Sequence, residues 1–164
     1  LDMAMAEALA QAARRASAEG ARLVLLRAEG PVFGAGADLK ERQGMGDDAV
    51  RARRVKGFAA YAAIEALPMP SIAVVEGPAV GSGVEMAAAC DIILATPAAS
   101  FRTPEALWGT VGATQRLPRV LGKRLAKDLM FTGRVLSAEE ALAHGLVARL
   151  VPAEGLEAAL AEMT

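Results

Sequence analysis

A short aliphatic segment that runs into a glycine-rich turn occurs twice in the sequence. This repeated pattern limits the possible folds more than any other feature. Residues 22–27 precede the first turn, at Gly34-Ala35-Gly36-Ala37-Asp38, and residues 71–76 precede the second, at Gly81-Ser82-Gly83. Aliphatic runs of this length, bounded by turns, are typical of buried strands. The second turn is followed directly by an apolar segment over 84–90, which predicts a helix that begins at the turn.

Strands alternate with helices along the rest of the chain. The sequence predicts further strands over 91–95 and 146–151, and further helices over 1–18, over 47–67 and at the carboxyl end. Thr103 is expected to cap a helix whose first residue is Pro104, and Ser137-Ala138-Glu139-Glu140 forms a capping box. Such alternation implies parallel strands joined by right-handed crossovers. The fold class is therefore α/β, and the 164 residues are expected to form a single domain.

Composition and charge exclude several classes of protein. The chain is 54% apolar and 23% charged, which excludes a disordered chain. Its formal net charge of −1 argues against nucleic acid or an anionic membrane as a partner. The basic face of the helix over 47–67 is the only support for an RNA partner, and such a run is usually solvated. No apolar stretch approaches the ~20 residues of a transmembrane helix, and no signal peptide is evident, so we expect a soluble cytoplasmic protein.

Cys90 and His144 are the single cysteine and the single histidine. One cysteine excludes an internal disulfide framework and a CxxC metal site, and one histidine leaves few ways to build a histidine metal site. Ser82 lacks the Gly-x-Ser-x-Gly setting of a hydrolase nucleophile, and His144 is expected to cap carbonyls in the last turn of a helix. We therefore predict no metal site, and a serine hydrolase is a minor alternative.

Both glycine turns have the means to bind an anion. Small residues let backbone N–H groups approach a ligand, and a helix N-terminus adds partial positive charge. The anion is either a phosphate or an oxyanion formed during a reaction. The dinucleotide fingerprint is incomplete at both turns, because Leu39 and Met86 stand where its third glycine belongs. Either turn alone could equally be a plain turn.

Two glutamates close to these turns are candidates for acid–base chemistry. Glu85 lies in the first turn of an otherwise apolar helix, where a carboxyl group facing the core needs a partner or a purpose. Glu105 lies at another helix start, and for Glu105 alone a role in stabilising the helix N-terminus is the simpler explanation. Two carboxyl groups beside an oxyanion site can instead hold a water, one accepting a proton while the other donates one.

Four segments, in this order, resemble the crotonase, or enoyl-CoA hydratase/isomerase, superfamily. They are Phe33-Gly34-Ala35-Gly36-Ala37-Asp38-Leu39-Lys40, Gly77-Pro78-Ala79-Val80-Gly81-Ser82-Gly83-Val84-Glu85, Ala89-Cys90-Asp91 leading to Phe101-Arg102-Thr103-Pro104-Glu105, and Thr114-Gln115-Arg116-Leu117-Pro118-Arg119. The stretch from Phe131-Thr132-Gly133-Arg134 to Gly145-Leu146-Val147 matches the ending of the family pattern. The resemblance implies the crotonase-like ββα superhelix, a spiral of parallel strands with flanking helices.

The resemblance also implies the roles of individual residues. The main-chain amides of Ala37 and Ser82 would form the oxyanion hole for the thioester oxygen of an acyl-CoA. Ser82 stands where the family usually has glycine, but only its amide is needed. Glu85 would orient and activate water, Glu105 would exchange a proton with the α-carbon, and Lys40 would lie near a CoA phosphate. The residues implied to bind CoA are Ala35, Ala37, Asp38, Leu39, Lys40 and Gly81.

The activity implied by the resemblance is hydration of a trans-2-enoyl-CoA to a 3-hydroxyacyl-CoA, with no cofactor beyond the CoA thioester that is the substrate. A Δ3-Δ2 enoyl-CoA isomerase is an alternative, although similar isomerases often use a single acid. A non-catalytic paralogue or fragment that only binds acyl-CoA is another. Arg102 and Trp108 are expected near the acyl pocket, where packing is the simpler role for Trp108.

The chain departs from the family pattern in one loop and at its ends. The segment Gly109-Thr110-Val111-Gly112-Ala113 is shorter than the family's Pro-Gly-x-Gly-Gly insertion before Thr-Gln-Arg. The family's N-terminal strands before Leu1 and its C-terminal helical region after Thr164 are absent, so we expect a truncated chain. With those regions present, the resemblance implies a homotrimer, or a hexamer made of two trimers.

Overall fold

Four parallel strands form the main sheet of the protein, seen in a computed structural model that describes residues 1–110 and 112–163. The strands are β1 (Val24–Arg27), β2 (Ser71–Val75), β4 (Ile92–Ala95) and β7 (Arg149–Leu150), hydrogen-bonded in the order β1-β2-β4-β7. All three pairings are parallel, and every residue of β2 is buried. The predicted parallel α/β organisation is therefore confirmed, although β7 occupies only two residues of the strand expected over 146–151.

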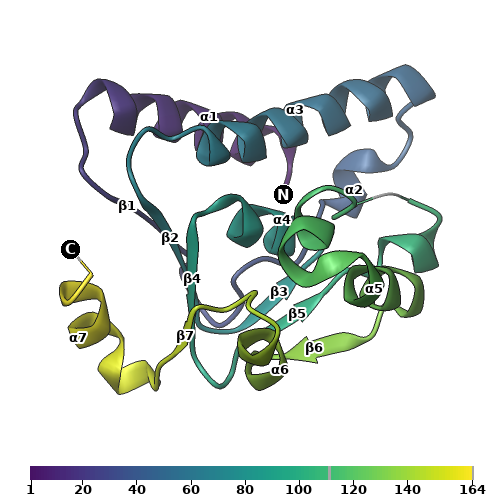
Figure 1. Cartoon of the computed structure of the whole chain (residues 1–164). Helices are drawn as coiled ribbons and strands as arrows, with labels where there is room; N and C mark the ends of the chain where they lie inside the picture. Colours follow the sequence, from purple (N-terminus) through teal and green to yellow (C-terminus); the bar gives the residue numbers. More distant parts are fainter. Residues whose placement is uncertain (111, 164) are drawn as a thin grey trace.

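A second, smaller sheet was not predicted from the sequence. It consists of β3 (Pro78–Val80), β5 (Ser100–Arg102) and β6 (Val135–Ser137), in the order β3-β5-β6 (Figure 1). The pair β3–β5 is parallel, whereas β5–β6 is antiparallel. Strands of three residues are too short to show a period of two, so pattern analysis misses them. A single bridge from Gly34 to Ala79 attaches the first glycine turn to this sheet.

Two long helices, α1 (Met3–Ala18) and α3 (Asp47–Glu65), lie side by side and form one layer of the molecule (Figure 1). Ala6, Ala10 and Ala60 are buried where they meet. These short side chains allow a close approach of the two helix axes. The short helix α2 (Leu39–Arg42) follows the first glycine turn. The helices predicted over 1–18 and 47–67 are confirmed with small changes at their ends.

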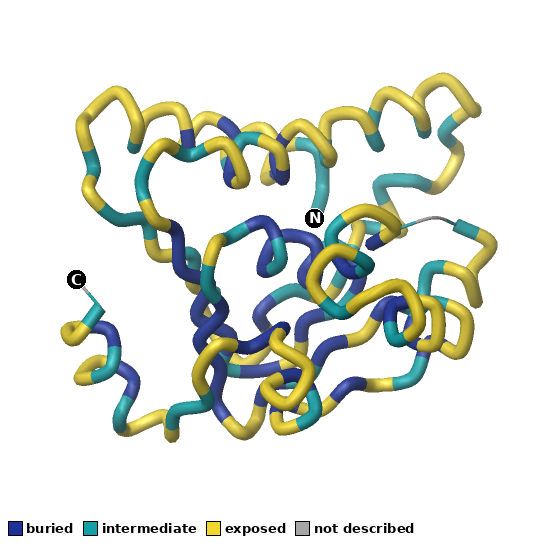
Figure 2. Tube along the Cα trace, viewed as in Figure 1, coloured by how far each residue is buried: buried dark blue, intermediate teal, exposed yellow. Residues whose placement is uncertain are grey.

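The helix α4 (Ser82–Ala89) is buried at the centre of the fold, between the α1–α3 layer and the two sheets (Figure 2). It begins two residues before the predicted start, directly after Gly81, whose φ of 52° lies in the region that favours glycine. Its apolar side chains belong to the main hydrophobic core with those of β2 and β4. The second glycine turn therefore aims a helix N-terminus from the core toward the first glycine turn.

The helix expected at Thr103-Pro104 starts later and has a different form. A 3₁₀-helix, η1 (Glu105–Trp108), has Pro104 at its N-cap position and no side-chain cap. The capping role predicted for Thr103 is therefore wrong, because the helix begins one residue too late for the Thr103 hydroxyl to reach its free amides. That hydroxyl is buried and has no hydrogen-bond partner in the described part of the chain.

The last third of the chain closes the fold with α5 (Arg116–Thr132), α6 (Ala138–Ala143), η2 (Ala153–Gly155) and α7 (Leu156–Ala161). The helix α5 is kinked at Gly122, where φ is 73°. Ser137 caps α6 by accepting a hydrogen bond from the amide of Glu140, as predicted. The Glu140 carboxylate does not return to Ser137 but pairs with Arg134. No helix in the described residues is both long and apolar enough to cross a membrane.

Candidate active site

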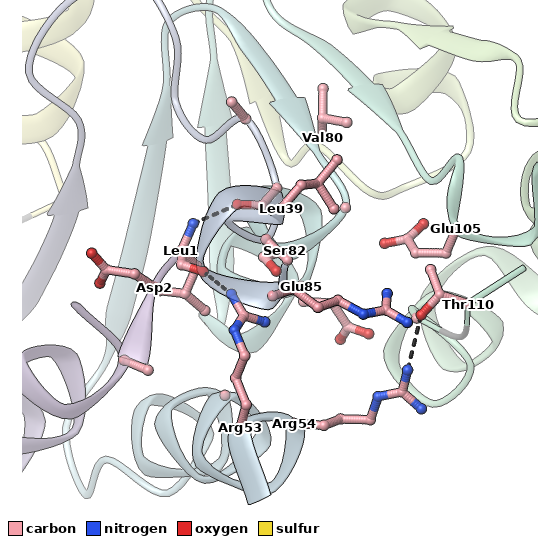
Figure 3. A pocket seen from close by; sticks show the side chains of 18 of the residues that line it. Leu1, Asp2, Leu39, Arg53, Arg54, Val80, Ser82, Glu85, Glu105 and Thr110 are labelled. Atoms are coloured by element: carbon pink, nitrogen blue, oxygen red, sulfur yellow. Dashed lines mark hydrogen bonds between the residues drawn. The ribbon is translucent and has the colours of Figure 1, made fainter. Parts of the chain in front are cut away.

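A cavity of about 570 Å³ lies where α3, both glycine turns and η1 meet (Figure 3). Its volume is within the range that binds small organic ligands. Ala37, Ser82, Glu85 and Glu105 all line it, although they come from three separate stretches of the chain. The structure therefore brings together the four residues that the sequence marked as candidates for catalysis.

The two glycine turns are in direct contact, which explains why glycine is needed in both. A Cβ atom at Gly83 would lie 2.6 Å from the carbonyl oxygen of Gly34, and a Cβ atom at Gly34 would lie 2.8 Å from the Cα atom of Gly83. Side chains at these positions would separate the turns. Their absence lets the amides of Ala37 and Ser82 approach the cavity from two different segments.

The two amides have free hydrogen-bonding capacity. The amide of Ala37 has no acceptor within the described residues. Ser82 is the first residue of α4, and the amides of a first helical turn have no partner within the helix. The partial positive charge of the α4 N-terminus lies at the same place. This arrangement can bind an oxyanion, as the sequence indicated.

Glu85 is 5% exposed and has partners on both carboxylate oxygens. The amide of Ala113 donates a hydrogen bond to Oε1, and Nη1 of Arg116 lies 3.3 Å from Oε2. Ala113 has a φ of 57°, which is rare outside glycine and aims its amide at the carboxylate. The buried carboxyl group therefore has the partners that its burial requires.

Glu105 has very different surroundings. Its Oε2 atom is buried and has no hydrogen-bond partner in the described part of the chain. Two glycines make room for it, since a Cβ atom at Gly81 or Gly112 would lie 2.8 Å or 2.7 Å from its Oε1 atom. Burial is the largest effect on Glu105 and raises its pKa. A hydrogen bond from its own main-chain amide lowers the pKa, and the negative charge of Glu85 raises it. Glu105 is therefore biased toward the protonated form.

Sequence reasoning missed Tyr61 and gave Arg116 no role. Tyr61 is 4% exposed and lines the cavity from α3. Burial raises the pKa of Tyr61, and a side-chain hydrogen bond with Ser82 opposes the shift. Arg116 belongs to the Thr-Gln-Arg segment of the family pattern. A buried Glu85 needs a cation as a partner, and this need was the signal that could have identified Arg116.

The residues predicted to bind CoA fall into two groups. Ala35, Ala37, Leu39 and Gly81 line the cavity. Asp38 and Lys40 are not among the lining residues. The carboxylate of Asp38 accepts hydrogen bonds from the amides of Lys40 and Glu41, so it caps α2, and these bonds lower its pKa. The Lys40 side chain is exposed, and its contact with a CoA phosphate stays a prediction.

The shortened loop and its neighbours define one edge of the cavity. Arg54 reaches from α3 and donates a hydrogen bond to Thr110 Oγ1 at 2.9 Å, as Figure 3 shows. Val111, in the middle of this loop, lies outside the described residues, as does Thr164 at the carboxyl end. Trp108 lines the cavity but is 74% exposed, so the packing role predicted for it is wrong. Arg102 points elsewhere, toward the carbonyl oxygen of Gly133.

The elements of a serine hydrolase do not come together. Ser82 lines the cavity, whereas His144 lies at the C-terminal end of α6 and is not among the lining residues. The amide of His144 donates to the carbonyl of Glu140 at the end of α6, and capping of carbonyls by the His144 side chain stays a prediction. The cavity therefore supplies amides and carboxyl groups rather than a nucleophile and its base.

The comparisons with known proteins agree with this geometry. The model of the family described as "Enoyl-CoA hydratase/isomerase" matches residues 1–164. An enoyl-CoA isomerase/hydratase of Mycosarcoma maydis is 41% identical over 135 residues, which are 80% of this chain and 49% of that protein. The mitochondrial methylglutaconyl-CoA hydratase of Homo sapiens is 42% identical over 134 residues, which are 79% of this chain and 40% of that protein.

Solved structures give the same result for the fold. An enoyl-CoA hydratase from Bacillus anthracis superimposes on this chain with a TM-score of 0.93 at 39% identity. The superposition covers 99% of this chain and 65% of the Bacillus anthracis chain. An enoyl-CoA hydratase from Mycobacterium smegmatis gives a TM-score of 0.94 at 34% identity, with coverage of 99% and 65%. The chain thus spans about two thirds of these structures and about half the length of the curated relatives that it matches.

Proposed function

Because the chain belongs to the enoyl-CoA hydratase/isomerase family and has the crotonase fold, we propose that the protein hydrates a trans-2-enoyl-CoA to a 3-hydroxyacyl-CoA. One observation carries the proposal: two carboxyl groups in contrasting surroundings line one cavity beside two free amides. Glu85 is paired with a cation, whereas Glu105 is biased toward its protonated form. Addition of water needs one group that takes a proton and one that gives a proton.

In the proposed reaction, the thioester oxygen accepts hydrogen bonds from the amides of Ala37 and Ser82. Negative charge grows on this oxygen as the substrate becomes enolate-like, and the amides stabilise it. A single donor of this kind is typically worth about 3–4 kcal/mol of the barrier. The amides are aimed before the substrate arrives, because the turns that carry them are fixed by the contact of Gly34 with Gly83.

The two glutamates divide the elements of water between the two carbons. Glu85 takes a proton from a water molecule, whose oxygen bonds to the β-carbon. The electron pair of the double bond moves toward the thioester, and Glu105 gives its proton to the α-carbon. Hydroxyl and hydrogen have then been added to the substrate, Glu85 is protonated and Glu105 is ionised. Proton exchange with solvent restores both groups.

The second candidate, an enoyl-CoA isomerase, is favoured by one feature. Both oxygens of Glu85 already have partners, whereas Glu105 has a buried oxygen without a partner in the described residues. A single free acid is sufficient to move a proton between two carbons of a 3-enoyl-CoA. An isomerase would convert such a substrate without incorporating oxygen from water, and it would keep this activity after Glu85→Gln.

Location and assembly are two further parts of the proposal. The protein would act in the cytoplasm, and with the family's remaining N- and C-terminal regions present it would assemble as a trimer or as a pair of trimers. Light scattering of the purified protein tests the assembly, because a monomer or dimer of constant mass would contradict it. Cell fractionation tests the location.

The test of the proposed function is consumption of crotonyl-CoA, followed by loss of the conjugated enoyl absorbance. We expect loss with the unmodified protein and a turnover at least about a hundredfold lower with Glu105→Gln. Glu139→Gln is the matched control, because Glu139 is an exposed glutamate of α6 outside the cavity. Equal turnover in all three proteins would overturn the assignment of Glu105. Binding of crotonyl-CoA with no turnover in any of them would indicate a non-catalytic acyl-CoA-binding protein.

A further inference from the structure

Arg116 is a buried cation directly behind one of the two carboxyl groups of the cavity. Its side chain is 12% exposed and extends from the first turn of α5. Nη1 lies 3.3 Å from Oε2 of Glu85, and Nη2 lies 2.6 Å from Oε2 of Glu65. Arg116 is not among the residues that line the cavity, so it reaches the substrate only through Glu85.

The guanidinium group is held on a second side by an aromatic ring. Its Cζ atom lies 5.7 Å from the centroid of the Tyr61 ring, within the range of a cation–π contact. Tyr61 and Glu65 both belong to α3, so this helix fixes the position of Arg116 from behind. A planar guanidinium that spans two carboxylates and rests on a ring has little freedom to rotate.

The charges that face Glu85 explain why a cation is needed there. Glu105 comes from η1 and its charge acts against that of Glu85. Tyr61 faces Glu85 from α3 and carries no charge while protonated. Within residues 1–110 and 112–163, Arg116 is the cation that lies within 4.0 Å of Glu85. Without it, the amide of Ala113 would be the remaining partner of this buried carboxylate among the described residues.

We propose that Arg116 is the positioning residue of the reaction: it fixes the rotation of the Glu85 carboxylate at the wall of the cavity. The amide of Ala113 holds the other oxygen. Each carboxylate oxygen has two lone pairs, so Glu85 can still accept a proton from water while both contacts are kept. This inference rests on the proposed hydration and adds to it the residue that orients Glu85.

The test compares Arg116→Gln with Arg119→Gln in the hydration of crotonyl-CoA. Arg119 is on the same helix, its side chain is 66% exposed, and it lies 3.9 Å from the same Glu65, so it is a matched control without contact to Glu85. We expect Arg116→Gln to lower kcat by roughly ten- to a hundredfold with little change in KM. Arg119→Gln is expected to leave both constants unchanged.

The conservative variant separates a positioning role from a merely structural one. Arg116→Lys retains a cation, but one ammonium group cannot span both glutamates. We therefore expect Arg116→Lys to restore the thermal stability that Arg116→Gln loses while it restores only part of kcat, with KM again little changed.

Each outcome has one meaning. If Arg116→Gln matches Arg119→Gln in kcat, or loses thermal stability with no fall in kcat, the positioning role is wrong. If the unmodified protein does not hydrate crotonyl-CoA, the proposed function fails instead. If Arg116→Gln does not fold, Glu65→Gln decides, since Glu65 is half exposed and holds the Arg116 guanidinium from the other side. Its kcat must then fall with little change in KM, and an unchanged kcat overturns the inference.

Discussion

The surroundings of Glu85 and Glu105 differ in almost every physical respect, although both side chains line the same cavity. Glu85 projects from a regular α-helix in the core and has an amide and a guanidinium on its two oxygens. Glu105 begins a short 3₁₀-helix and has one buried oxygen without a partner in the described residues. A cation and an amide hold the first carboxyl group, whereas burial raises the pKa of the second.

This difference shows that two acids in one cavity can have separate roles because their surroundings differ. Cation and amide contacts favour an ionised carboxylate, whereas burial without partners favours the neutral acid. Groups whose environments push them in opposite directions can act as base and acid in a single step.

Replacement of either acid by glutamine should abolish hydration but affect isomerisation differently. We expect Glu85→Gln and Glu105→Gln each to lower kcat for crotonyl-CoA by about 10²–10⁴-fold, because each removes one proton transfer. With a 3-enoyl-CoA, the Glu85→Gln protein should retain any isomerase activity, while Glu105→Gln should lose it. Equal residual activity of the two variants on both substrates would show that the two acids do not have separate roles.

Crowding of Glu105 should lower activity with little loss of stability. In Gly112→Ala, the new Cβ atom would meet the Glu105 carboxyl group at 2.7 Å and displace it. A displacement of this kind costs about tenfold or more in kcat. Gly46→Ala is the control, because Gly46 has no atom within 4 Å of its Cβ position and a φ of −70°. If both variants retain full turnover, the position of the Glu105 carboxyl group is not critical.

The thermal stability of the two glutamine variants should change in opposite directions at neutral pH. Because burial raises the pKa of Glu105 in the folded protein, stability is lost as pH rises through that raised pKa. Glu105→Gln removes this loss and should raise Tm by a few degrees at neutral pH but not at acidic pH. Glu85→Gln should lower Tm at neutral pH, because it leaves the Arg116 cation without one partner. Melting curves at both pH values check these signs.

We expect the smallest effect on thermal stability from a surface ion pair far from the cavity. This pair is a reference for the variants of the cavity. Hydrogen bonds from Arg134 lower the pKa of Glu140, so the pair stabilises the protein above the ordinary pKa of glutamate, and this contribution is lost as pH falls through the lowered pKa. Glu140→Gln should therefore reduce Tm slightly at neutral pH and leave it unchanged in acid. Hydration activity should be unaffected. A large loss of stability would show that this exposed pair matters more than such pairs usually do.

The sequence predicted the parts of the molecule that depend on local chemistry. The buried strand over 71–75, the glycine turn at Gly81 and the cap at Ser137 follow from side-chain volume, backbone freedom and capping hydrogen bonds. The resemblance placed Glu85 and Glu105 correctly at one cavity. The strand, the turn and the cap are fixed within a few residues of the chain, whereas the meeting of the two glutamates was implied by the resemblance alone.

What could not be predicted depends on contacts between distant residues. The short strands β3, β5 and β6 form because neighbouring segments supply their hydrogen bonds. The link from Glu65 through Arg116 to Glu85 joins three helices. Trp108 is exposed at the end of η1, and no local pattern in the sequence encodes that exposure.

The most direct test of this contrast is the titration of Glu105 itself by carbon-13 NMR of protein labelled at the glutamate carboxyl carbon. The signal that disappears in Glu105→Gln identifies the residue. We predict that the pKa of Glu105 lies above the range of the exposed glutamates, because burial and the charge of Glu85 both raise it. A Glu105 signal that titrates together with those of the surface glutamates would contradict the assignment of this residue as the proton donor.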